Sequence, residues 1–280
     1  MRHLEQYAKS PFEWPLILLF LMLASTITIV LLDRSMPQKT IDIAIYSDAG
    51  TWGESVQATQ KMFQWMGYTV EMVKAKDINE PNFLNRFRIL CVPGGDMYQY
   101  SQDISPNGRE KIRDFVRSGH GYIGICGGAY YANEEVIWRG SKLPMTPLGL
   151  LQGTAIGPLN EIVEYPNYAM VDIRMADSGH PITREESSPA WILYYWGPTF
   201  VIDDEHNISI LGRYARTNQP AIVALAYGRG RVFLIGTHPE IEEDSDRDGV
   251  TFGDELEDKG SDWELMKKAV VWCLEAEPSS

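Results

Sequence analysis

The sequence predicts an α/β fold with a parallel sheet that carries helices on both faces. In the first half of residues 41–275, short β-branched runs alternate with segments of helical periodicity, which is the pattern of βαβ units. The chain has 280 residues and is 44% hydrophobic, enough for one α/β domain with a substantial core. A separate, strongly apolar segment near the N-terminus predicts one transmembrane helix.

The transmembrane prediction rests on residues 15–32, which contain no charged side chain and are rich in Leu and Ile. A helix of this length spans about 27 Å, close to the hydrocarbon core of a bilayer. A cleaved signal peptide is the alternative, but the stretch is long for one and no small-x-small site follows it. We expect a single-pass membrane protein with an extracytoplasmic C-terminal domain, divided as follows: tail 1–14, signal anchor 15–32, linker 33–40, domain 41–275 and tail 276–280.

Within the domain, each element is predicted from its local pattern. Runs of β-branched and aromatic residues predict strands, apolar residues at helical spacing predict helices, and Gly or Pro marks their ends. The predicted strands are Ile41–Tyr46, Tyr68–Val73, Arg88–Val92, Tyr122–Ile125, Ile208–Leu211, Ala221–Ala226 and Arg231–Ile235. The predicted helices are Glu54–Trp65, Arg109–Val116 and Trp263–Leu274. The carboxyl ends of parallel strands meet at one edge of a sheet, where ligands bind.

Charge and cysteine content exclude some classes of function. The net charge of -13 leaves no basic stripe for phosphates and argues against nucleic-acid binding. The three cysteines are too few and too scattered for a disulfide framework.

The most informative motif is a cysteine at a predicted strand-to-helix turn. In Gly121-Tyr-Ile-Gly-Ile-Cys-Gly-Gly-Ala129 an apolar strand leads into Cys126, with Gly124 and Gly128 on either side. This G-x-C-x-G spacing is that of a nucleophile elbow, where glycines allow a strained backbone and close packing. The N-terminus of the following helix points N–H groups at the sulfur, which favours thiolate. Cys126 is therefore the candidate nucleophile.

A cysteine nucleophile needs a base, and the best candidate follows the predicted strand Arg231–Ile235. His238 and Glu240 are separated there by Pro239, which keeps the chain extended. Residues i and i+2 of an extended segment point the same way. Glu240 can therefore hold the imidazole in one tautomer and stabilise its charged form.

An oxyanion hole is the remaining requirement of acyl chemistry. The N–H group of Gly127, directly after the nucleophile, is one candidate donor. Gly94 and Gly95, at the end of another predicted strand, can supply the second, because only glycine lets the backbone approach a substrate oxygen closely. The alternative for this glycine pair is an ordinary tight turn.

Together, these motifs resemble class I glutamine amidotransferase domains. The motifs, in chain order, are Val92-Pro-Gly-Gly95, Gly124-Ile-Cys-Gly-Gly128 and His238-Pro-Glu240. More narrowly, residues 40–275 look like the amidotransferase-like domain at the N-terminus of some biotin–protein ligases. That narrower resemblance rests on Gly124-Ile-Cys-Gly-Gly-Ala-Tyr-Tyr-Ala132, Leu150-Leu-Gln-Gly-Thr-Ala-Ile-Gly-Pro158 and Tyr194-Tyr-Trp-Gly-Pro-Thr-Phe200.

The resemblance implies a flavodoxin-like three-layer sandwich with a mainly parallel sheet. It also implies a Cys126–His238–Glu240 triad and a thioester intermediate in amide hydrolysis or transfer. Glutaminases usually carry Gln four residues after the nucleophile to hold their substrate, and this chain has Tyr130 there. We therefore expect cysteine-dependent chemistry on a small-molecule or peptide amide, without assigning glutamine.

An acidic segment just past the candidate triad fits a calcium-loop pattern. Asp244-Ser-Asp-Arg-Asp-Gly-Val-Thr-Phe-Gly-Asp-Glu255 matches D-x-D-x-D-G-x5-E in full. The hard oxygen ligands would come from Asp244, Asp246, Asp248, Val250 and Glu255. The alternative is a solvated acidic loop. We expect any bound calcium to be structural, and no cofactor for catalysis.

Two other functions remain open for the same residues. The domain can be a non-catalytic module whose pocket binds a small ligand or a protein segment. Cys126 can also be a redox sensor, although no resolving cysteine lies near it in sequence.

Overall fold

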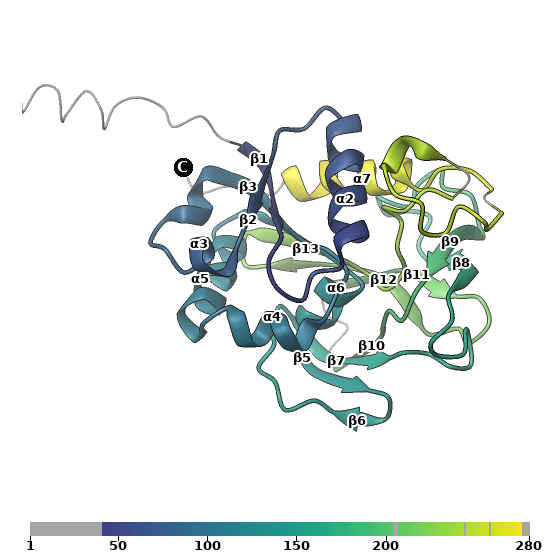
Figure 1. Ribbon diagram of the computed structural model, residues 1–280, viewed down its shortest axis with the longest axis horizontal. Helices are drawn as coiled ribbons and strands as arrows, with labels where there is room; N and C mark the ends of the chain where they lie inside the picture. The colour runs from purple at the N-terminus through teal and green to yellow at the C-terminus, as the bar shows by residue number, and fades with distance from the viewer. Residues whose placement is uncertain (1–40, 204–206, 244, 258, 276–280) are drawn as a thin grey trace, which may run out of the picture. The chain divides into compact units, whose positions relative to one another are not determined.

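A large mixed sheet forms the centre of the structure (Figure 1). The computed structural model describes residues 41–203, 207–243, 245–257 and 259–275. Within these residues, nine strands form the sheet in the order β2-β1-β3-β4-β13-β12-β11-β8-β9. Helices cover it, so the fold is mixed α/β, as the sequence predicts.

The first half of the sheet is parallel. Its strands are β1 (Ile41–Tyr46), β2 (Val70–Val73), β3 (Phe87–Val92), β4 (Gly121–Ile125) and β13 (Gly230–Ile235). Their register is continuous across the centre of the sheet, because β4 pairs in parallel with both β3 and β13. Counted along the chain, the order of these five strands is 2-1-3-4-5, which is that of flavodoxin-like sheets.

The second half of the sheet is antiparallel, and the expectation of a mainly parallel sheet is corrected on this point. It contains β8 (Ala169–Met175), β9 (Ala190–Tyr194), β11 (Ile208–Tyr214) and β12 (Pro220–Tyr227). Among the described strands of this sheet, four of the eight pairings are parallel and four antiparallel. The change to antiparallel pairing begins between β13 and β12. A tight turn at Gly228 reverses the chain between these two strands, and such turns join antiparallel strands.

A smaller sheet, absent from the sequence prediction, packs beside the large one. Its described strands are β5 (Asn133–Trp138), β6 (Ser141–Lys142), β7 (Leu151–Gly157) and β10 (Thr199–Ile202), in the order β10-β7-β5-β6. Val136, Ala155 and Phe200 from this sheet join the same buried cluster as the large sheet's Leu90 and Val92. The small sheet therefore extends the core on one face of the large sheet.

Helices lie on both faces of the large sheet, as Figure 1 shows. Successive residues of β1 alternate between two buried clusters, with Ile43 and Ile45 in one and Ala44 and Tyr46 in the other, because side chains alternate across a strand. The first cluster includes residues of α2 (Gly53–Trp65) and α7 (Trp263–Leu274). The second includes residues of α3 (Ala75–Ile78), α4 (Met97–Asp103), α5 (Pro106–Arg117) and α6 (Gly127–Tyr131). Two short 3-10 helices, η1 (Phe83–Arg86) and η2 (Asp246–Asp248), complete the described elements.

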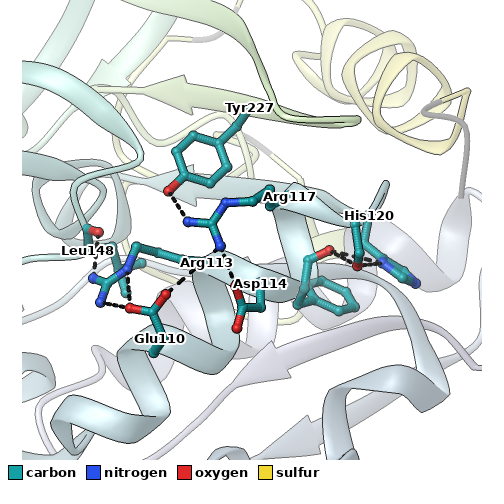
Figure 2. Close-up of polar contacts among 9 residues, drawn as sticks. Glu110, Arg113, Asp114, Arg117, His120, Leu148 and Tyr227 are labelled. Atoms are coloured by element: carbon teal, nitrogen blue, oxygen red, sulfur yellow. Dashed lines mark hydrogen bonds and ion pairs between the residues drawn. The ribbon is translucent and has the colours of Figure 1, made fainter. Parts of the chain in front are cut away.

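Polar contacts hold α5 against its surroundings (Figure 2). Arg113 donates to the carbonyl oxygen of Leu148 at 3.1 Å, and Arg117 donates to the hydroxyl of Tyr227 on β12 at 3.3 Å. At the end of this helix, Nδ1 of His120 lies 3.0 Å from the carbonyl oxygen of Phe115. These groups serve the structure of the α5 region, and His120 lies in the connection between α5 and β4.

The predicted membrane localisation is corrected by the helices that are described. No helix among residues 41–203, 207–243, 245–257 and 259–275 is long and apolar enough to cross a membrane. The longest of them, α2, has 13 residues and spans about 20 Å, against about 30 Å for a bilayer core. The predicted anchor, residues 15–32, lies outside the described residues.

The close packing of β3 against α6 gives a test of the fold. A Cβ atom on Gly128 would lie 1.9 Å from the carbonyl oxygen of Val92, whereas one on Gly53 would meet nothing within 4 Å. We expect Gly128→Ala to lower the free energy of unfolding by about 2 kcal/mol or more, the usual effect of overpacking. The matched change Gly53→Ala should stay within about 0.5 kcal/mol of wild type. Urea unfolding of the three proteins checks this, and equal midpoints would contradict the packing described.

Candidate active site

The candidate residues lie at the carboxyl ends of three neighbouring parallel strands. The turn Pro93–Gly95 follows β3, Cys126 follows β4, and the segment Gly236–Glu240 follows β13. Since β3, β4 and β13 are adjacent in the sheet, the topology brings together three motifs that are far apart in sequence. This edge is where open α/β sheets bind their ligands.

Cys126 has the strained backbone of an elbow. Its φ and ψ are 47° and -102°, in a region that residues with a Cβ rarely occupy. Its N–H donates to the carbonyl oxygen of Ile235 at 2.9 Å, and its own carbonyl accepts from Tyr130 N–H at 2.9 Å. Gly124 makes room for this turn, because a Cβ there would lie 2.7 Å from the carbonyl oxygen of Gly128. The following helix, α6, has only five residues, so its dipole acts over a single turn.

His238 is fully buried between two hydrogen-bond acceptors. Its Nδ1 lies 2.8 Å from Oε1 of Glu240, and its Nε2 lies 3.2 Å from the carbonyl oxygen of Tyr195. A neutral imidazole has one N–H and can donate to only one of these oxygens, whereas an imidazolium donates to both. The surroundings of the ring therefore favour its protonated form.

Charge acts in the same direction on His238. Burial by itself lowers its pKa, but electrostatic interactions and hydrogen bonds with Cys126 and Glu240 outweigh this. The pKa of His238 consequently lies well above its usual value. The sulfur of Cys126 lies 3.5 Å from the same Tyr195 carbonyl oxygen that His238 faces. The structure thus brings the predicted nucleophile, base and orienting carboxylate together in one place.

Ser55 is a site residue that the sequence analysis missed. This fully buried serine of α2 donates from Oγ to Oε1 of Glu240 at 2.5 Å and accepts from the N–H of Gly94 at 2.9 Å. It therefore connects the carboxylate to the glycine turn after β3. A signal existed in the sequence, because Ser55 shares the core-facing side of α2 with Met62, where a polar residue needs a partner.

The hydrogen bond to Ser55 changes the interpretation of the oxyanion turn. Because the N–H of Gly94 donates to Ser55, it is not available to a substrate oxygen. Within the described part of the chain, the N–H groups of Gly95 and Gly127 donate to no protein acceptor. These two glycines are in close contact, since a Cβ on Gly127 would lie 2.3 Å from the carbonyl oxygen of Gly95. Gly95 and Gly127 are thus the pair of predicted donors that stay free.

A cavity of about 420 Å³ opens in front of Cys126. Six of its lining residues are aromatic: Trp52, Tyr98, Tyr130, Trp138, Tyr195 and Trp196. The others are Gly95, Asp96, Met97, Leu143 and Cys126. Tyr130 is buried and donates its hydroxyl to the carbonyl oxygen of Trp196 at 2.9 Å. Tyr195 and Trp196 also belong to the lining of the cavity.

The acidic loop is only partly described. Asp248 is buried and accepts from the backbone N–H groups of Glu242 at 2.9 Å and Val250 at 3.1 Å. Glu255 is exposed and accepts from the hydroxyl of Tyr168. Among the described residues, no three carboxylate, His or Cys side chains are grouped so that they could hold a metal ion. Asp244 lies outside those residues, and the calcium site stays a prediction.

Comparison with known proteins identifies the family of this site. The family described as "Biotin-protein ligase, N terminal" matches residues 41–267, which contain all the candidate site residues. The chain belongs to the biotin–protein ligase N-terminal family. The narrower of the two resemblances in the sequence is thereby confirmed.

Relatives of this biotin–protein ligase N-terminal domain occur in proteins of different size. The biotin–protein ligase of Schizosaccharomyces pombe is 26% identical over 185 residues, 62% of this chain but only 28% of that protein. An uncharacterized protein of Chlamydia muridarum is 29% identical over 214 residues, 71% of this chain and 80% of that protein. The chain therefore spans little more than a quarter of the S. pombe enzyme, and resembles the chlamydial protein over most of its length.

Solved structures share the fold of this biotin–protein ligase N-terminal domain at low sequence identity. A ThuA-like protein of Bacteroides uniformis has a TM-score of 0.52 and 12% identity, covering 85% of this chain and 94% of that one. A cytoplasmic protein of Salmonella typhimurium has a TM-score of 0.51 and 13% identity, covering 83% and 98%. At these identities the likeness concerns the fold alone.

The two acceptors around His238 predict its titration. His120 and His180 have pKa values lowered by burial, whereas the pKa of His238 is raised. In nitrogen-detected NMR we expect His238 to keep both ring protons near neutral pH while the other two titrate below about 6.5. Glu240→Gln should move the titration of His238 to lower pH. A neutral His238 near pH 6 in the wild type would contradict this arrangement.

The raised pKa also has a consequence for stability. A histidine with a raised pKa contributes stability that is fully present below about pH 6.5 and is lost as pH rises through its folded-state pKa. Thermal unfolding of the wild type should therefore lose more stability over that range than unfolding of Glu240→Gln. Parallel pH profiles for the two proteins would show that Glu240 does not hold the proton on His238.

Ser55 can be tested against a neighbour on its own helix. Ser55→Ala leaves the buried Gly94 N–H without its acceptor and removes one donor from Glu240, which should cost about 1–3 kcal/mol of unfolding free energy. Thr59 is equally buried, and its hydroxyl has no partner among the described residues. Thr59→Val should therefore be neutral or stabilising. If both changes cost the same in urea unfolding, the role of Ser55 is refuted.

Proposed function

We propose that this domain is a cysteine-dependent amide hydrolase or amide transferase. Cys126 acts as nucleophile, His238 as acid and base, and Glu240 as the group that orients the imidazole. The observation that carries the proposal is the position of His238, which lies between Glu240 and the main-chain oxygen beside Cys126. Such an arrangement stabilises the charged imidazole that proton transfer from a thiol produces.

Formation of the thioester would proceed in one addition and one elimination. The sulfur of Cys126 attacks the amide carbonyl carbon, and the negative charge develops on the carbonyl oxygen. The free N–H groups of Gly95 and Gly127 are suited to stabilise that oxygen. His238 then gives the proton on Nε2 to the leaving nitrogen, the C–N bond breaks, and an amine leaves behind a thioester on Cys126.

The thioester is resolved by a second nucleophile. When water attacks the thioester carbon, Nε2 of His238 accepts a proton from it, the C–S bond breaks and a carboxylic acid leaves. When an amine attacks instead, the same steps give a new amide, and the domain acts as a transferase. Throughout the cycle, Glu240 keeps Nδ1 protonated and the ring in one orientation.

Binding without turnover is the second candidate function, and one observation favours it. Cys126 is only 7% exposed, and aromatic side chains surround the cavity that leads to it. A ligand can fill such a cavity without meeting the sulfur. Enhanced reactivity of Cys126 is what separates an enzyme from a binding module on this fold.

Alkylation with iodoacetamide near neutral pH tests the proposed function. The full chain carries two internal controls, Cys91 and Cys273, which are 0% and 1% exposed and have pKa values raised by burial. We expect peptide mass spectrometry to show Cys126 modified at least about tenfold faster than either, as befits an activated cysteine.

The greater exposure of Cys126 would by itself make its alkylation faster than that of Cys91 and Cys273. The comparison with His238→Asn is therefore the one that decides. This change removes the base but leaves the exposure of the sulfur nearly unaltered. If the enhanced reactivity depends on His238, the labelling rate of Cys126 falls by about tenfold or more in this variant. An unchanged rate in His238→Asn, or equal labelling of Cys126 and Cys91, would favour the binding module instead.

A further inference from the structure

The cavity in front of Cys126 has an aromatic wall that the chemistry of a thioester does not require. Its six aromatic residues are Trp52, Tyr98, Tyr130, Trp138, Tyr195 and Trp196. From this wall we infer the substrate class, in an inference that rests on the proposed function. The acyl group transferred to Cys126 is aromatic or bulky and apolar, and it carries no carboxylate.

The aromatic side chains pack on one another as well as on the cavity. The rings of Trp52 and Tyr195 are 5.1 Å apart and edge to face, and those of Tyr195 and Trp196 are 4.2 Å apart. The rings of Tyr130, on α6, and Trp138, at the end of β5, are 5.7 Å apart. Mutual packing of this kind fixes the rings before a ligand binds, so a flat apolar group meets a preformed surface.

Trp52 of the aromatic wall also packs against His238, the proposed base. The ring of Trp52 stands perpendicular to that of His238, with their centroids 5.1 Å apart. A group that packs against Trp52 is therefore placed beside His238 and Cys126, where its carbonyl carbon must lie. Aromatic binding and acyl transfer thus use adjoining parts of one cavity.

Charge excludes an anionic acyl group. Among the residues that line the cavity in the described part of the chain, Asp96 is the sole carboxylate and there is no Lys, Arg or His. Asp96 is held in place because its Oδ1 accepts from the N–H groups of Tyr98 and Gln99 at the start of α4. A substrate carboxylate would therefore lose water, find no cation among the lining residues, and be repelled by Asp96. The nearest cation, the buried imidazolium of His238, is already paired with Glu240.

The polar groups of the wall suit an uncharged ligand. The hydroxyl of Tyr130 already donates to the carbonyl oxygen of Trp196. The indole N–H of Trp196 is buried and has no acceptor among the described residues. One donor of this kind can serve a neutral oxygen or nitrogen of the acyl group, but it cannot balance a full negative charge.

The volume of the cavity is consistent with an aromatic acyl group. At about 420 Å³, the cavity lies within the usual range of small-molecule sites, roughly 300–1,000 Å³. A phenylpropanoyl or indolyl-acetyl group fits such a space together with the carbonyl that must reach Cys126.

Two p-nitrophenyl esters of similar acyl length, one of 3-phenylpropanoic acid and one of glutaric acid, test whether the site prefers an aromatic acyl group to an anionic one. Attack by Cys126 breaks the ester C–O bond, releases p-nitrophenolate and leaves a thioester, which intact-protein and peptide mass spectrometry locate. We expect the phenylpropanoyl ester to acylate Cys126 at least about tenfold faster than the glutaryl ester, relative to their rates with free cysteine. Equal relative rates, or a preference for the glutaryl ester, would overturn the inference.

Variants at the rim identify the cause of the preference. Tyr98 is 38% exposed, so its replacement does not disturb the core. Tyr98→Ala should slow phenylpropanoylation about fivefold, the effect of one lost aromatic contact, whereas Tyr98→Phe, which keeps the ring, should slow it less. Trp65→Ala, which removes an exposed aromatic side chain outside the cavity, is the matched control. Equal effects of Tyr98→Ala and Trp65→Ala would contradict a role for the aromatic wall.

Asp96→Asn tests the exclusion of charge. Asparagine keeps the cap of α4, so the change removes only the negative charge from the cavity. The rate of the glutaryl ester relative to the phenylpropanoyl ester should then rise several-fold, and the gain should shrink at high salt. If neither rate changes, charge is not the cause of the selectivity.

The iodoacetamide experiment distinguishes failure of this inference from failure of the proposed function. Fast, His238-dependent alkylation of Cys126 together with no preference between the esters overturns the substrate class alone. Alkylation of Cys126 no faster than that of Cys91 contradicts the proposed function, and the substrate class with it.

Discussion

The hydrogen bond between His238 and Glu240 is the interaction on which the rest of the site depends. Both side chains are completely buried, and a carboxylate removed from water is costly unless several groups pair with it. The hydrogen-bond partners of Glu240 come from distant parts of the chain. Ser55 of α2 donates to the Glu240 carboxylate, and the indole of Trp263 on α7 donates to its main-chain oxygen at 3.1 Å. One buried glutamate thereby joins both helices of one face of the sheet to the end of β13.

The burial of the His238–Glu240 pair also explains why the lining of the surrounding cavity is apolar. A buried ion pair is strengthened when water is kept away from it, and the aromatic rings of Trp52 and Tyr195 lie directly against His238. These rings separate a small polar centre from solvent and leave the approach to Cys126 apolar. Electrostatic stabilisation of a developing oxyanion is greatest in such surroundings. The aromatic wall therefore also keeps water away from the hydrogen-bonded pair of His238 and Glu240.

The sequence predicts the centre of this arrangement better than its periphery. Cys126, His238 and Glu240 could be found because each follows a β-branched run and stands in a short motif of glycine or proline. The role of the Tyr195 carbonyl oxygen could not be predicted, because every residue has a main-chain carbonyl and the residue type does not indicate which one acts as an acceptor. The hydrogen bond from the Gly94 N–H to Ser55 could not be predicted for a related reason, because Ser55 lies 39 residues away on another element. Strands such as β5 and β10 were missed because tertiary pairing stabilises them more than local propensity does.

A crystal structure of the protein treated with 3-phenylpropanal would show whether Cys126 is the nucleophile of this site, because an aldehyde adds reversibly to an active cysteine and imitates the tetrahedral intermediate. We expect a bond from Sγ of Cys126 to the aldehyde carbon. The new oxygen should lie within hydrogen-bond distance of the N–H groups of Gly95 and Gly127, and the phenyl ring should pack against Trp52 and Tyr195. An adduct on another residue would contradict it, as would an unmodified Cys126 or an adduct oxygen directed away from both glycines.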